Sequence, residues 1–114
     1  HPQVQMGYDI RAQAAADLGD KALAIASYRE LLALREAALG AQDIKTIDAA
    51  WNLEGLLRKR GDLAASDELR TRYVTPLLQA QPSALDDDQK RMAKNIRDTE
   101  ASEAQASVQK PVVR

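Results

Sequence analysis

Apolar residues recur at three- and four-residue spacing along most of the chain, the spacing that places them on one face of an α-helix. This pattern predicts helices over about 2–18, 22–39, 44–60 and 64–80, and a weaker one over about 86–104. The second segment is the most densely apolar, so we expect it to be buried on more than one side. The pattern fades after residue 102, and residues 105–114 are predicted to form a disordered tail.

Glycine and aspartate mark two of the breaks between these helices. Gly19 and Gly61 each follow a helical stretch, where a glycine with positive φ commonly ends a helix. Asp20 and Asp62 come next and are predicted to N-cap the following helices. Pro76 lies inside the fourth segment, where it predicts a kink or an early end, because proline removes a helical hydrogen bond.

Other residues predict the remaining helix boundaries and four charge pairs. Gly40 is predicted to end the second helix, and Asp43 to cap the third. Ser83 and Asp86 have the spacing of a capping box before the last helix. Four pairs at i,i+4 spacing are predicted to stabilise single helices: Glu54–Arg58, Glu68–Arg72, Asp86–Lys90 and Asp87–Arg91.

The two Gly-Asp dipeptides are 42 residues apart, and a fixed period of this length is typical of repeat proteins. Each unit is then one helix-turn-helix hairpin, over about 1–42 and 43–84, with 86–104 as a closing helix. The predicted fold class is all-α, with antiparallel helix-turn-helix repeats stacked into a short solenoid of about five helices. We treat residues 1–100 as one repeat domain.

Composition narrows the possible functions. The chain has 45% apolar residues, a net charge of −1, a single His and no Cys. No long basic stripe supports nucleic-acid binding, and no apolar run reaches the length of a membrane span. Without a clustered catalytic motif or thiol ligands, we predict a non-enzymatic protein with no cofactor, soluble in the cytoplasm or a bacterial periplasm.

One block resembles a known family. The sequence from Tyr28 to Gly40, YRELLALREAALG, is similar to the end of a repeat in the tetratricopeptide family, in the 42-residue variety of kinesin light chains and many bacterial proteins. Trp51-Asn52-Leu53 falls on that family's Asn-Asn-Leu region, and His1-Pro2 on its His-Pro. The first unit departs from the pattern, with Asp9-Ile10-Arg11 where Asn-Asn-Leu is usual. The resemblance implies a right-handed solenoid whose concave groove binds a peptide or helix of a partner protein.

The resemblance also suggests a binding site. In the family, an Asn on the first helix of a repeat faces the groove and binds peptide backbone, a role that falls on Asn52. Asp48, Gly55 and Lys59 share its face at helical spacing, and Gly55 would let a ligand chain approach closely. The structural alternative is that Asn52 bonds the next helix and Gly55 relieves crowding. Trp51 is either an interface anchor or, more commonly, part of the core.

Two charge clusters have simpler explanations. Asp86-Asp87-Asp88 lacks the spacing of a calcium loop, and acidic residues are favoured at a helix start, so no metal site is predicted. Arg58-Lys59-Arg60 is either a contact for an acidic partner or a solvated helix end.

The function predicted from sequence is therefore a protein-protein interaction module. The alternative is a regulatory or sensor segment of a larger bacterial protein, such as a serine/threonine kinase or a transcription regulator. Because His1 falls at a repeat boundary, we also expect a longer array or self-association through an exposed repeat face.

Overall fold

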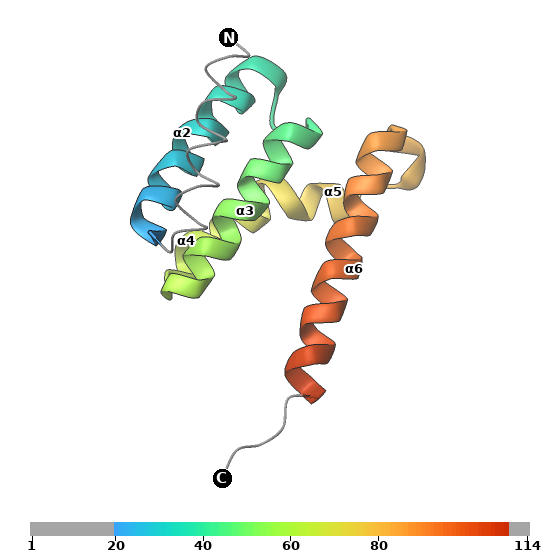
Figure 1. Ribbon diagram of the computed structural model, residues 1–114. Coiled ribbons are helices and arrows are strands. Elements are labelled where there is room, and N and C mark those ends of the chain that lie inside the picture. Colours follow the sequence, from blue (N-terminus) through green and yellow to red (C-terminus); the bar gives the residue numbers. More distant parts are fainter. Residues whose placement is uncertain (1–19, 110–114) are drawn as a thin grey trace. The chain divides into compact units, whose positions relative to one another are not determined.

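The computed structural model describes the backbone of residues 20–109 and the side chains of residues 20–105, all of which form helices, turns or short loops with no strand. The predicted first helix, Gly19 and the last five residues lie outside this range. The elements are α2 (Lys21–Leu39), α3 (Ile44–Arg60), α4 (Leu63–Leu69), the π-helical turn η1 (Arg70–Val74), α5 (Thr75–Gln79), the 3₁₀ turn η2 (Pro82–Ala84) and α6 (Asp87–Gln109) (Figure 1). The chain divides into two units after Gln79. The all-α class is confirmed for the described residues.

The breaks between α2, α3 and α4 form largely as the sequence predicts. Asp20 Oδ1 accepts the Leu23 N–H at 3.0 Å, and Asp43 Oδ1 accepts the Lys45 N–H at 2.9 Å, so both N-caps are confirmed. Gly61 has φ of +93°, and the next N–H, that of Asp62, bonds the Leu57 carbonyl at 2.9 Å. This bond is the long one of a Schellman motif, which requires a residue that tolerates positive φ.

Asp62 corrects one sequence prediction. It occupies the N-cap position of α4, but its side chain makes no capping hydrogen bond. Arg60 holds its carboxylate instead, with Nε at 2.9 Å and Nη2 at 2.6 Å from Oδ2. Two charge-assisted hydrogen bonds to one carboxylate oxygen are stronger than a single bond from a backbone amide, so the guanidinium competes successfully for Asp62.

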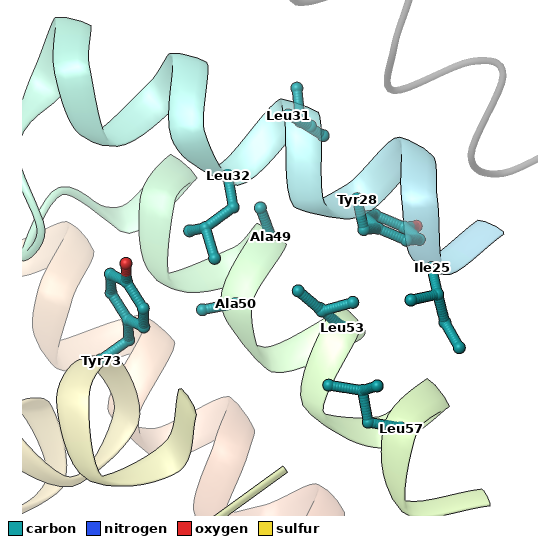
Figure 2. Close-up of a cluster of buried hydrophobic side chains, with 9 residues drawn as sticks. All are labelled: Ile25, Tyr28, Leu31, Leu32, Ala49, Ala50, Leu53, Leu57 and Tyr73. Carbon is teal, nitrogen blue, oxygen red and sulfur yellow. The ribbon is translucent and has the colours of Figure 1, made fainter. Parts of the chain in front are cut away.

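The core of unit 1 lies between α2 and α3, which the four-residue turn after α2 folds into an antiparallel hairpin. Figure 2 shows Leu32 of α2 and Leu53 of α3 directed into the space between the helices, with Tyr73 closing one side. Alanines on α3 permit a close approach of the helices. The cluster consists of Ile25, Tyr28, Leu31, Leu32, Ala49, Ala50, Leu53, Leu57 and Tyr73.

Helix α4 runs through η1 into α5 without a break, although a kink or early end was predicted near Pro76. The Thr75 N–H reaches the Arg70 carbonyl, five residues back, which is the π-helical pattern. A π turn inserts one residue, so each later residue takes the place that its predecessor would occupy in an α-helix. Leu77 is thereby fully buried and Pro76 is exposed, whereas an uninterrupted α-helix would place Pro76 in the buried position.

Unit 2 contains η2 and α6. A capping box opens α6, but its members are Asp86 and Gln89, because the Gln89 N–H donates to Asp86 Oδ1 at 2.7 Å and the Asp86 N–H donates to Gln89 Oε1 at 2.9 Å. The proposed Ser83–Asp86 box is therefore wrong. Gln89 stands three residues after the cap, as the motif requires.

The predicted ion pairs at the start of α6 do not form in the described structure. Asp86 is used in the cap, and Arg91 bonds Asp88 at 3.2 Å rather than Asp87. Farther along, Lys94 bonds Asp98 at 2.6 Å. Helix α6 continues to Gln109, beyond the expected end near residue 104 and into the predicted tail.

Candidate interaction surface on α3

The four residues predicted to form a binding surface lie on one side of α3, opposite its buried face. Asn52 and Lys59 are exposed, and Asp48 and Gly55 are partly exposed. We call Asp48, Asn52, Gly55 and Lys59 the α3 strip. The buried face consists of Thr46, Ile47, Ala49, Ala50, Leu53, Glu54 and Leu57. Helical periodicity alone produces this division, because the strip residues are spaced three and four apart.

Asn52 makes its hydrogen bond within its own helix. Its Nδ2 donates to the Asp48 carbonyl at 2.9 Å. The described residues show no bond from Asn52 to a neighbouring helix, which the structural alternative required. An exposed amide that makes one local bond keeps a second N–H donor and its carbonyl acceptor for another molecule.

Gly55 has open space where a side chain would stand. A Cβ built on it meets no described atom within 4 Å. Crowding between the described helices therefore gives no reason for a glycine here, although glycine in a helix costs about 1 kcal/mol relative to alanine. A bare stretch of helix backbone remains at the middle of the strip.

The two charged ends of the strip differ. Arg35 of α2 lies 3.8 Å from Asp48 and donates from the same Nη1 to the Lys45 carbonyl at 2.9 Å. Lys59 has no ion-pair partner among residues 20–105, whereas Arg58 and Arg60 on either side of it each bind a carboxylate. At one end of the strip the negative charge of Asp48 is therefore partly offset by Arg35, whereas at the other end the positive charge of Lys59 is not paired within residues 20–105.

Glu54 is a buried charge that the sequence pattern does not reveal. Its predicted bond to Arg58 is confirmed at 2.7 Å, but only 1% of its side chain is exposed. Arg70 of η1 binds the other carboxylate oxygen at 3.2 Å, and the Ser66 hydroxyl donates to the Glu54 backbone carbonyl at 3.0 Å. The i,i+4 spacing predicted the local half of this cluster; the contribution of Arg70 depends on the fold.

A second carboxylate, Glu36 near the end of α2, binds two side chains of η1. Tyr73 Oη donates to Oε1 at 2.5 Å and Arg72 Nη2 to Oε2 at 2.9 Å. The Tyr73 hydroxyl is the main cause that lowers the pKa of Glu36, and burial followed by the Glu36 bond raises the pKa of Tyr73 to about 12. Arg72 binds Glu36, and its predicted bond to Glu68 does not form.

The remaining candidates show less. Trp51 is only partly buried. Among the described residues, no three His, Cys, Asp or Glu side chains lie so that they could hold a metal ion. This holds also for Asp86, Asp87 and Asp88. None of the helices in the described part of the chain is long and apolar enough to cross a membrane.

Comparison of the chain with protein-family models, with curated proteins and with solved structures finds no match.

Proposed function

We propose that this chain is a protein-protein interaction module that binds an extended peptide segment along the α3 strip. The observation that carries the proposal is the open space over Gly55, flanked by the exposed amide of Asn52. A bare helix backbone lets another main chain approach closely, and an Asn side chain can donate to and accept from a peptide bond at the same time.

The architecture that we propose for this function is a short tetratricopeptide-like solenoid. Its support is the 42-residue spacing of the Gly-Asp pairs and the antiparallel packing of α2 on α3. In such a solenoid the first helices of successive repeats line one surface, and α3 would be such a helix. Stacked hairpins leave their terminal faces open, which is the basis for self-association in this proposal.

Peptide selection tests the proposal without a known partner. A displayed peptide library is selected on the immobilised 114-residue chain, and the dissociation constant of the best peptide is measured by calorimetry. We expect Asn52→Ala to weaken binding about tenfold, the cost of losing one or two hydrogen bonds to a peptide group. Asn95→Ala, an exposed asparagine on α6, is the matched control and is expected to have no effect.

A second variant, Gly55→Leu, is expected to keep or stabilise the fold while it abolishes peptide binding. A Cβ at Gly55 meets no described atom within 4 Å, and leucine favours helix more than glycine, so the fold is expected to be retained or stabilised. The leucine side chain would occupy the space above the backbone and abolish peptide binding. Unchanged affinity in both Asn52→Ala and Gly55→Leu would exclude the strip as the binding surface.

A further inference from the structure

We draw no further inference here: the strongest candidate, the apolar surface that Leu23 and Leu63 expose at the first turns of α2 and α4, rests on exposure alone, because nothing in the described part of the chain shows what covers it.

Discussion

Glu54 and Glu36 are two carboxylates of unit 1 that each accept bonds from two side chains, and each involves the π turn η1. Glu54 is buried and binds one arginine of its own helix and one from η1, whereas Glu36 is about a quarter exposed and binds two side chains of η1. The first depends on its partners to remain charged without water. The second retains contact with solvent, so its links to η1 add stability that solvent can partly replace. We therefore expect burial, more than the number of bonds, to decide how much each of the two residues contributes to the free energy of unfolding.

The largest effect is expected at Glu54. Glu54→Ala removes the buried carboxylate together with its bonds to Arg58 and Arg70, each worth about 1.5–3 kcal/mol as a hydrogen bond to a charged group. Chemical denaturation monitored by circular dichroism measures the loss. A loss no larger than that of Glu36→Ala would contradict the contrast drawn from burial.

Tyr73→Phe tests the Glu36 side of the comparison. The ring is 4% exposed and belongs to the core cluster, so phenylalanine keeps the packing and removes only the hydroxyl bonded to Glu36. We expect a loss of about 1.5 kcal/mol, the lower end of the range for a hydrogen bond to a charged group, because Glu36 is partly exposed. The same denaturation experiment applies, with Tyr28→Phe as a comparison at another buried tyrosine.

The pH dependence of the free energy of unfolding independently tests the hydrogen bond between Tyr73 and Glu36. The pKa of Glu36 is lowered in the folded state, so its contribution is present above the unfolded value and is lost as pH falls through the folded pKa. The pKa of Tyr73 is raised to about 12, so stability is expected to decline as pH rises from about 10, the unfolded tyrosine value, to about 12. Tyr73→Phe is expected to flatten both limbs, and identical profiles for the variant and the parent chain would argue against the bond.

Sequence reasoning succeeded where neighbours along the chain decide the structure. The glycine stops at Gly40 and Gly61, the caps at Asp20 and Asp43 and the Glu54–Arg58 pair are local features, and they form. The positions on the α3 strip likewise follow from helical spacing, although their role in binding stays a prediction.

Sequence reasoning failed where a residue distant in the sequence competes with a nearby one for the same partner. Glu68 is four residues from Arg72, but Glu36 with the Tyr73 hydroxyl offers Arg72 a carboxylate on another helix. Arg60 takes the side chain that would cap α4 in the same way. The burial of Glu54 depends on Arg70, which no short-range pattern relates to it. These competitions are decided by packing, so their outcome requires the fold.

The smallest effect is expected at Pro76, where two explanations of the π turn differ. If proline alone causes it, Pro76→Ala would restore an α-helix and rotate the chain after residue 75 by one position. That rotation would place the new alanine where Leu77 is now fully buried. Loss of a buried leucine typically costs about 2–5 kcal/mol, so packing favours the π turn even when no proline opposes the α-helix. We therefore expect the π turn to persist in Pro76→Ala, with the free energy of unfolding changed by less than about 1 kcal/mol, because the added N–H and the greater freedom of the unfolded chain oppose one another.

Nuclear Overhauser contacts of the Leu77 methyl groups distinguish the two explanations. Contacts retained with the core would assign the π turn to packing, and contacts transferred to residue 76 would assign it to proline.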